Sequence, residues 1–185
     1  MARTVAVLVG SLRKASFNRK TALALTGLAR PGLELSIIEI GDLPLYDEDA
    51  EASPPQPWLR FRNEVRAREA VLFVTPEYNR SVPGVLKNAI DVGSRPYGQS
   101  VWSKKPGAVV SVSPGAIGGF GANHHLRQSM VFLDVPMLQQ PEVYLGGAAK
   151  IFDQAGKLID EGATALLQKF IAAFEAWIET CLRRP

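Results

Sequence analysis

Residues 4–18 read TVAVLVGSLRKASFN, and this stretch decides the fold class. Its first part, Thr4–Val9, is an unbroken apolar run rich in valine that ends at Gly10. An unbroken run suits a strand buried on both faces of a parallel sheet, because a half-exposed strand alternates apolar and polar residues. The polar turn and the helical pattern that follow predict a strand, a loop and a helix in immediate succession.

Outward from this stretch, the same order of elements repeats along the chain. Strands are expected at Leu33–Ile40, Ala70–Val74 and Gly107–Val112, with a short irregular fifth strand at Pro136–Tyr144, which holds two prolines. Apolar residues three or four positions apart predict helices at Phe17–Ala29, Trp58–Glu69, Val82–Ser94, Asn123–Leu133 and Thr164–Leu182. Proline and acidic residues predict a long surface loop at Gly41–Pro57.

Strands that alternate with helices predict a doubly wound α/β fold. Five strands and about five helices fit a flavodoxin-like five-stranded parallel sheet of strand order 2-1-3-4-5, with helices on both faces. The closing helix carries Phe170, Phe174 and Trp177, which are expected to pack into the core rather than form an interface. No internal repeat or linker is visible, so residues 1–185 are expected to form a single domain.

The composition excludes several classes of protein. Hydrophobic residues make up 46% of the chain and charged residues 21%, which is ordinary for a globular protein and argues against disorder. A net charge of +3 and a pI of about 9.1 favour anionic small molecules, but the scattered Lys and Arg argue against a nucleic-acid partner. The only cysteine, Cys181, cannot form an internal disulfide, which fits a reducing compartment. No apolar run approaches the ~20 residues of a membrane span, so no membrane partner and a cytoplasmic location are expected.

The loop after the first strand, residues 10–18, is suited to a phosphate group. In open parallel sheets, ligands bind beyond the carboxyl ends of the strands, and a helix N-terminus there offers free N–H groups. Ser11, Ser16 and Asn18 add side-chain donors, and Arg13 can pair with two phosphate oxygens at once. The loop has one glycine and no Gly-Lys-Ser/Thr ending, so it is neither a dinucleotide fingerprint nor a P-loop. The alternative is a capping serine beside solvated cations.

Two more loops leave the same edge of the predicted sheet. Residues 75–84 read TPEYNRSVPG, and the two prolines hold a backbone that can lie along the edge of a flat heterocycle. Residues 113–121 read SPGAIGGFG, and four glycines let a backbone approach a ligand closely. The alternatives are a rigid turn that only starts the next helix and, for the glycine-rich segment, a flexible loop.

Obvious catalytic side chains are missing from these loops. Ser113 lacks the Gly-x-Ser-x-Gly context of a nucleophile elbow, and no isolated pair of carboxylates is present. His124 and His125 are adjacent, so on a helix they point about 100° apart and cannot share a metal. The pattern therefore favours a cofactor that carries its own chemistry and needs only binding and orientation from the protein.

Taken together, the three loops resemble the NADPH-dependent FMN reductase family, in its branch that reduces quinones and chromate. The resemblance rests on Gly-Ser-Leu-Arg-x-x-Ser-Phe-Asn at 10–18, Pro-Glu-Tyr-Asn-x-Ser-x-Pro-Gly from 76, and Gly-Ala-Ile-Gly-Gly at 115–119. It extends from about Val5 to Trp177, which is nearly the whole chain.

The resemblance implies a set of FMN-binding residues, with no catalytic side chain and no metal. Around the FMN phosphate it places Ser11, Arg13, Ser16, Phe17 and Asn18. Along the isoalloxazine ring, largely through backbone groups, it places Pro76, Glu77, Tyr78 and Asn79, and on the ring and ribityl side Ser113, Gly115 and Gly118. It also implies a homodimer or homotetramer with the flavin near an interface. Relatives carry a tyrosine where this chain has Arg80, an extra cation beside the ring.

The expected function is that of an FMN-dependent NAD(P)H oxidoreductase that reduces small acceptors such as quinones, flavins, chromate or azo compounds. The expected cycle is ping-pong: NAD(P)H delivers hydride to flavin N5 and leaves before the acceptor takes its place. The main alternative is a flavodoxin-type electron carrier with a protein partner, although such carriers are typically acidic. A flavin-free phosphate-binding domain and a hydrolase are further alternatives. The acceptor and the choice between NADPH and NADH stay open.

Overall fold

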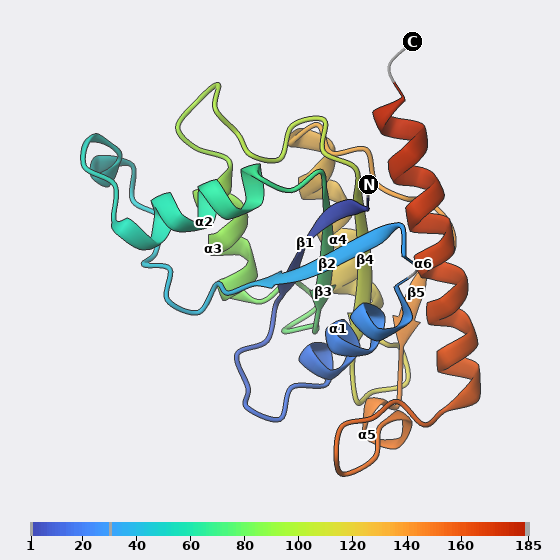
Figure 1. Ribbon diagram of the computed structural model, residues 1–185. Coiled ribbons are helices and arrows are strands. Elements are labelled where there is room, and N and C mark those ends of the chain that lie inside the picture. Colours follow the sequence, from blue (N-terminus) through green and yellow to red (C-terminus); the bar gives the residue numbers. More distant parts are fainter. Residues whose placement is uncertain (1, 30, 184–185) are drawn as a thin grey trace.

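The computed structural model describes residues 2–29 and 31–183, and a five-stranded parallel sheet forms its centre (Figure 1). The strands run in the order β2-β1-β3-β4-β5, and every neighbouring pair is parallel, which confirms the expected topology. Their bounds are β1 Arg3–Val9, β2 Leu33–Ile38, β3 Ala70–Thr75, β4 Gly107–Val112 and β5 Val143–Leu145.

Helices cover both faces of this sheet. Their bounds are α1 Phe17–Leu28, α2 Gln56–Arg66, α3 Gly84–Gly93, α4 Phe120–Phe132, α5 Ala148–Ile151 and α6 Glu161–Leu182, with a 3-10 helix, η1, at Glu48–Ala52. The hydrophobic cluster on one face joins the sheet to α1 and α6, and the cluster on the other joins it to α2, α3 and α4 (Figure 1).

The two clusters explain why the strands are apolar without a break. In β1, Val5 and Val7 point into the cluster of α1 and α6, whereas Ala6 and Leu8 point into the cluster of α2, α3 and α4. All four are fully buried, because a central strand has a helix layer on each side.

The fifth strand is shorter than the sequence predicts. The expected range was Pro136–Tyr144, but only Val143–Leu145 is a strand, and the earlier part meets β4 at a single bridge between Gly107 and Met137. The prediction of an edge strand is confirmed by its place in the sheet order. Pro136 and Pro141 have no N–H group to donate, so a continuous ladder cannot form across this range.

The loop at residues 41–57 is more ordered than expected. It contains η1, where the Asp47 carboxylate accepts a hydrogen bond from Asp49 N at 3.0 Å. Asn88 of α3 holds the loop from the side: its Oδ1 accepts from Tyr46 N at 2.8 Å and its Nδ2 donates to Pro44 O at 3.0 Å. The prediction of a long surface loop is confirmed, apart from η1 and the last two residues, which begin α2.

The closing helix packs as predicted. Phe170 and Phe174 are buried, and Trp177 is half-buried with its indole N–H donating to Pro136 O at 2.8 Å. The short helix α5 was not anticipated, since four residues are too few to show a helical period. Among the described residues, no helix is long and apolar enough to span a bilayer.

Candidate functional site

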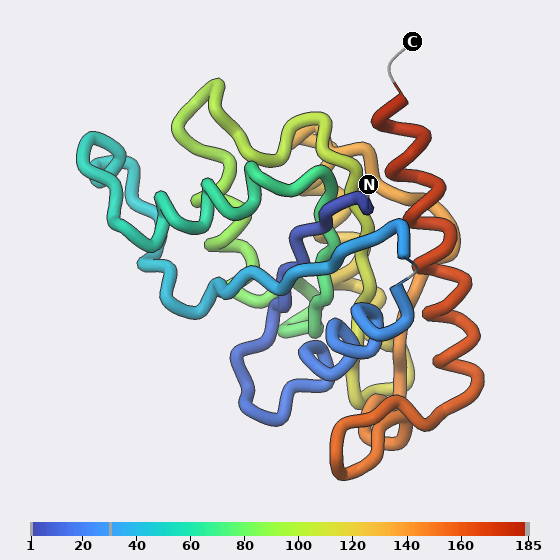
Figure 2. The backbone as a smooth tube through the Cα atoms, viewed as in Figure 1, coloured from blue at the N-terminus to red at the C-terminus, as the bar shows by residue number. Residues whose placement is uncertain are grey.

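The loops that follow β1, β3 and β4 come together at one end of the sheet, as the topology requires (Figure 2). Gly10 N donates to Val74 O at 2.9 Å, which ties the start of the first loop to the end of β3. Ser113 N donates to Leu145 O at 2.9 Å, which ties the third loop to the end of β5. The three predicted loops therefore form one surface.

In the first loop, three of the predicted residues are buried around the start of α1. Ser16 is the N-cap of α1, and its Oγ accepts a hydrogen bond from Arg19 N at 3.2 Å. Ser11, Ser16 and Asn18 are 8%, 3% and 4% exposed. A serine hydroxyl that accepts at a cap still has its own O–H to donate, so Ser16 can serve both the helix and a ligand.

The main chain of this loop offers a series of free donors. The N–H groups of residues 11–15, and of Phe17 and Asn18 at the start of α1, find no acceptor within residues 2–29 and 31–183. Asn18 Oδ1 is buried with no partner in the same part of the chain. This oxygen can only accept, so it would need a donor such as a hydroxyl and does not itself bind an anion. Consecutive free N–H groups at a helix N-terminus do form an anion-binding concavity. The loop therefore fits a phosphate group.

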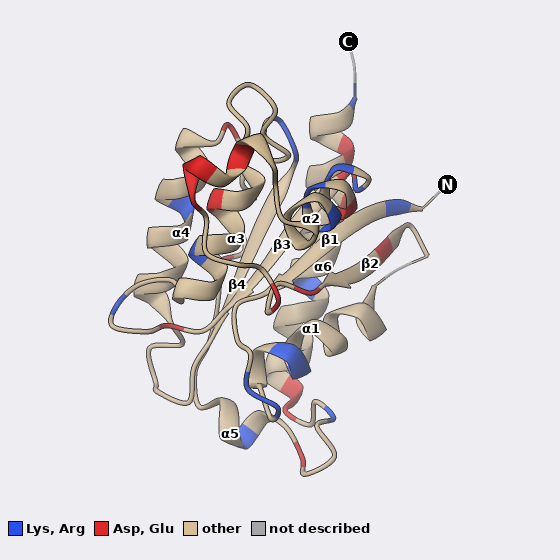
Figure 3. Cartoon of the chain, turned by 90° about the vertical axis from the view of Figure 1, so that its left-hand side faces the viewer, with Lys and Arg blue, Asp and Glu red and all other residues tan. Residues whose placement is uncertain are grey.

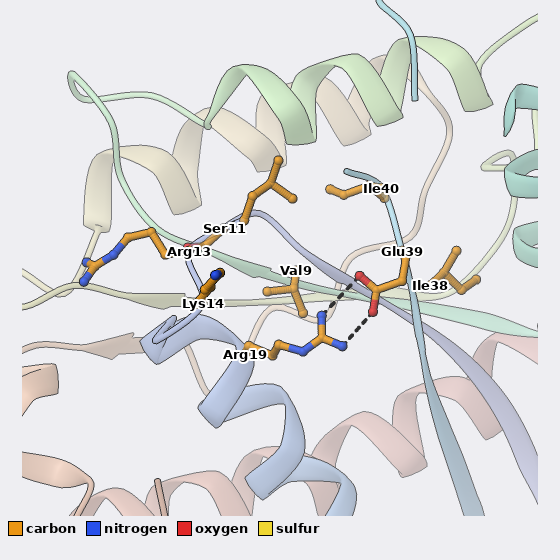
Figure 4. Close-up of a pocket in the computed structure, with 9 residues that line it drawn as sticks. Val9, Ser11, Arg13, Lys14, Arg19, Ile38, Glu39 and Ile40 are labelled. Atoms are coloured by element: carbon orange, nitrogen blue, oxygen red, sulfur yellow. Dashed lines mark hydrogen bonds and ion pairs between the residues drawn. The ribbon is translucent and has the colours of Figure 1, made fainter. Parts of the chain in front are cut away.

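Positive side chains accompany these donors. The exposed Arg13 and Lys14 border a pocket of about 320 Å³ between the first loop and the end of β2 (Figure 4). Arg19 is already paired with Glu39 at 2.6 Å, and its hydrogen bonds lower the pKa of the Glu39 carboxyl. Figure 4 shows Arg13 extending away from that ion pair, and Figure 3 shows basic segments in the loop before α1 and at its start. Arg13 and Lys14 are thus the cations available to an anion.

Phe17 lies apart from the other predicted residues of this loop. Its ring stacks on Phe152 with the centroids 6.4 Å apart, and it packs against the cluster of α1 and α6. Only its main-chain N–H remains at the mouth of the loop. The aromatic side chain therefore contributes to the core rather than to the ligand surface.

The second loop is a tight turn with a fixed backbone. Tyr78 and Ser81 exchange two main-chain hydrogen bonds of 3.0 Å each, and Asn79 and Arg80 between them have φ angles of 51° and 64°. Two consecutive residues with positive φ are the mark of a type I′ turn. Within the described residues, the N–H groups of Glu77, Asn79 and Arg80 have no acceptor, so they are available to the polar edge of a ligand.

Pro76 is buried at the base of this turn, while the Tyr78 ring is 49% exposed. The Glu77 side chain is only 14% exposed and points away from solvent. Its Oε2 accepts from Ala122 N of α4 at 3.1 Å, and its Oε1 accepts from Arg80 Nη1 at 3.2 Å. The Glu77 carboxylate is therefore engaged within the protein, and only its backbone is free for a ligand.

The third loop folds onto the end of the edge strand. Ser113 Oγ accepts from Gly115 N at 3.1 Å, and Gly118 N donates to Gly115 O at 3.3 Å. Gly118 has a φ of 65°, and a Cβ there would lie 2.6 Å from the carbonyl carbon of Tyr144. Any larger residue would push the loop off β5. The predicted residues Ser113, Gly115 and Gly118 are therefore brought together beside the second loop.

An aromatic cluster at the start of α4 was missed by the sequence analysis. The Phe120 ring lies 4.3 Å from the His124 ring and 5.3 Å from the Tyr144 ring, measured between centroids. His124 Nε2 and Tyr144 Oη are 2.8 Å apart, and burial together with Glu142 raises the pKa of Tyr144 to about 12. The four-residue spacing of Phe120 and His124 could have predicted that these two rings lie together on a helix. Nothing in the sequence around β5 indicated that Tyr144 would join them.

The two adjacent histidines have separate partners. His125 Nδ1 lies 2.7 Å from Ser81 Oγ, on the side of the second loop, whereas His124 contacts Tyr144. Within residues 2–29 and 31–183, no three or more His, Cys, Asp or Glu side chains are arranged to hold a metal ion.

With this geometry in place, comparison with known proteins identifies the class. Residues 3–150 match the model of the NADPH-dependent FMN reductase family, and the chain belongs to that family. It is therefore an oxidoreductase with FMN as cofactor and NAD(P)H as electron donor. This assignment favours the enzyme over the electron-carrier alternative.

Particular relatives refine the comparison. The chain is 67% identical over 177 residues to a quinone reductase of Pseudomonas putida, with 95% of each chain covered. It is 44% identical over 178 residues to a 2-hydroxy-1,4-benzoquinone reductase of a Burkholderia species, covering 96% of this chain and 97% of the relative. Among solved structures, FerB, a flavoenzyme NAD(P)H:(acceptor) oxidoreductase from Paracoccus denitrificans, superposes with a TM-score of 0.91 at 44% identity, covering 97% and 98% of the chains. A flavodoxin from Pseudomonas aeruginosa, at 21% identity and a TM-score of 0.58, shares the fold.

Proposed function

We propose that this protein is a quinone reductase that uses FMN bound at the junction of the three loops. The observation that carries the proposal is the run of N–H groups at residues 11–15 and at the start of α1, which find no acceptor within the described part of the chain. Relatives named as quinone reductases support the choice of acceptor.

For the phosphate of FMN, we propose the free N–H groups of this loop together with Ser11, Arg13, Ser16 and Asn18. Phe17 would contribute only its main-chain N–H to the phosphate, because its ring packs on Phe152. A dianion gains from both the helix N-terminus and the positive charge of Arg13.

For the isoalloxazine ring, we propose the backbone of Pro76, Glu77 and Asn79, the exposed face of Tyr78, and the loop of Ser113, Gly115 and Gly118. When bound, FMN supplies the redox chemistry, and the protein contributes binding and orientation. We propose that the free N–H groups of the second loop donate hydrogen bonds to the edge of the ring. The fixed type I′ turn supports this, because it holds these N–H groups in place.

The first test is an absorption spectrum of the purified protein after incubation with FMN and desalting, followed by NADPH without oxygen. Retained flavin bands that bleach with NADPH, and return when a benzoquinone is added, are the expected result. A protein that retains no flavin and shows no binding by titration would remove the proposal.

Steady-state kinetics tests the order of events. Donor and acceptor would occupy the same side of one site in turn, so double-reciprocal plots at several fixed quinone concentrations should be parallel lines. Intersecting lines would show that both must be bound together and would contradict the proposed cycle. Running the same assay with NADH and with chromate, free flavins and azo dyes ranks donors and acceptors by kcat/KM.

We further propose a homodimer or homotetramer that forms through the face of α3 and α4. A hollow of about 830 Å³ lies there, lined in part by Ile90, Phe132 and Leu133. Phe132 and Tyr97, which both line the hollow, are 90% and 91% exposed. An interface between two identical copies needs projections and a hollow on the same surface, and this face supplies both.

For the chain itself, we propose one FMN-binding domain spanning residues 1–185. Two hydrophobic clusters that share one sheet support this, because separate domains would each need a core of their own.

We also propose a cytoplasmic enzyme, a location in keeping with the free Cys181. Limited proteolysis and cell fractionation test these two points.

A further inference from the structure

We propose that the Glu77 carboxylate is a positioning latch that sets the spacing between the second loop, residues 76–81, and the third loop, residues 113–119. This inference rests on the proposed function, since it gives a role to a side chain at the proposed ring site. The Glu77 side chain acts through α4 and does not touch the ring, because its carboxylate is directed into the protein; only the Glu77 backbone is proposed to line the ring.

The first step is the way α4 begins. Its N-cap is Gly119, which has no side chain to accept a hydrogen bond from the first turn. Glu77 Oε2 takes that place from outside the helix and accepts from Ala122 N at 3.1 Å. A carboxylate at this position also interacts favourably with the positive end of the helix dipole. Glu77 therefore caps α4 at the third residue of its first turn, as the Ser16 hydroxyl caps α1 at Arg19 N.

The second step is the turn that Glu77 holds. Arg80 donates to Glu77 Oε1 at 3.2 Å, and its backbone is in the left-handed region with a φ of 64°. Left-handed backbone is unfavourable for residues other than glycine, so the turn needs support from its surroundings. Because the Arg80 side chain is 74% exposed, this ion pair contributes little. The turn is held by its own two main-chain hydrogen bonds, and it is joined to α4 by Glu77 and by the 2.7 Å contact of Ser81 with His125.

The third step concerns two glycines, Gly119 and Gly121, that lie beside the latch. A Cβ on Gly121 would lie 2.9 Å from Glu77 Oε2 and 3.2 Å from Arg80 O. A Cβ on Gly119 would lie 3.1 Å from Ser111 Cβ and 3.7 Å from Glu77 Cβ. Gly121, in the first turn of α4, thus leaves room for the second loop to close onto the helix, and Gly119 leaves room for Ser111 of β4.

Loss of the latch should weaken the protein's contacts with the flavin ring and leave its contacts with the phosphate unchanged. The test compares the dissociation constants of FMN and of riboflavin, which lacks the phosphate, for the wild type, Glu77→Ala and Glu77→Gln. For Glu77→Ala we expect about tenfold weaker binding of both flavins, a factor equal to about 1.4 kcal/mol. Glu77→Gln keeps an oxygen for Ala122 N and should stay within about threefold of the wild type.

The matched control is Asp160→Ala, which removes an equivalent cap from α6, far along the chain from the loops. Asp160 Oδ1 accepts from Ala163 N at 2.7 Å. This variant should lower Tm as Glu77→Ala does, but it should leave the dissociation constants of FMN and riboflavin unchanged. If Glu77→Ala lowers Tm and binds riboflavin as tightly as the wild type, Glu77 is only a helix cap and the inference is overturned.

If Glu77→Ala does not fold, Gly121→Ala tests the same latch. It keeps the carboxylate but displaces it from Ala122 N, so riboflavin binding should weaken; unchanged binding would overturn the inference. A wild-type protein that binds neither flavin would instead contradict the proposed function, and this outcome is distinct from a loss confined to the variants.

Discussion

At the scale of single residues, the hydroxyl of Ser16 has two roles that can be separated by experiment. It caps α1 through Arg19 N and lies, buried, in the loop proposed for the phosphate. Ser16→Ala should lower the free energy of unfolding by about 1 kcal/mol through loss of the cap. It should also weaken FMN binding while leaving riboflavin binding unchanged, as measured by fluorescence titration. Equal losses for the two flavins would place Ser16 outside the phosphate site.

A second prediction at this scale concerns acid stability. Glu69 Oε2 accepts from Thr4 N at 3.0 Å, and its other oxygen pairs with Arg3 at 2.7 Å. These contacts, the first above all, lower the pKa of the Glu69 carboxyl below its ordinary value of 4.5. The charged form is then favoured in the folded state, so this stabilisation is complete above pH 4.5 and is lost as the pH falls through the lowered pKa.

Glu69→Gln should therefore lower Tm at pH 7, and its difference from the wild type should shrink steadily below about pH 4.5. Thermal unfolding followed by circular dichroism across this range measures it. Glu34→Gln, at an exposed carboxylate of β2, is the control and should follow the wild type throughout. A Tm difference for Glu69→Gln that is constant with pH would contradict the linkage.

At the scale of elements, the end of α3 is specified by a glycine that packs against a tryptophan. The Trp102 indole lies against Gly93, its N–H donates to Ile90 O at 2.9 Å, and a Cβ on Gly93 would overlap the ring. Gly93→Ala should cost about 1–3 kcal/mol, because this part of the core cannot expand. Chemical denaturation measures the loss.

Gly84 at the other end of the same helix is the matched control. A Cβ there meets no atom within 4 Å, so Gly84→Ala should be neutral or stabilising by up to about 1 kcal/mol. If the two substitutions had equal effects, helix propensity rather than packing against Trp102 would explain the glycine at position 93.

At the scale of the whole molecule, the exposed Phe132 beside the hollow of α3 and α4 governs the predicted assembly. Phe132→Glu places a charge on a side chain that is 90% exposed, at the edge of the 830 Å³ hollow. We expect it to convert the oligomer to a monomer in size-exclusion chromatography with light scattering, because burying an unpaired charge is costly. Leu23→Glu, on α1 across the sheet, should leave the mass unchanged. If Phe132→Glu has the same mass as the wild type, the interface does not include this face.

The sequence by itself determined the layered sheet and brought the three loops of the proposed site to one edge of it. Unbroken apolar runs such as Val5–Val9 occur only where both faces of a strand are covered, and parallel strands bring their following loops to one edge. The polar helix start proposed for the phosphate was also visible in the sequence, because the capping Ser16 and the cations Arg13 and Lys14 are close together in the chain. Such features depend on local burial and local geometry, which residue order reports directly.

Tertiary structure alone decided which side chains of the site meet one another. Glu77 and Ala122 are 45 residues apart, and no local pattern reveals that a carboxylate of one loop caps the helix after another. The same holds for Phe17, whose ring turns away to Phe152, and for Tyr144, which reaches the start of α4 from the edge strand. These contacts follow from how the layers pack, and packing depends on the shapes of all the elements together.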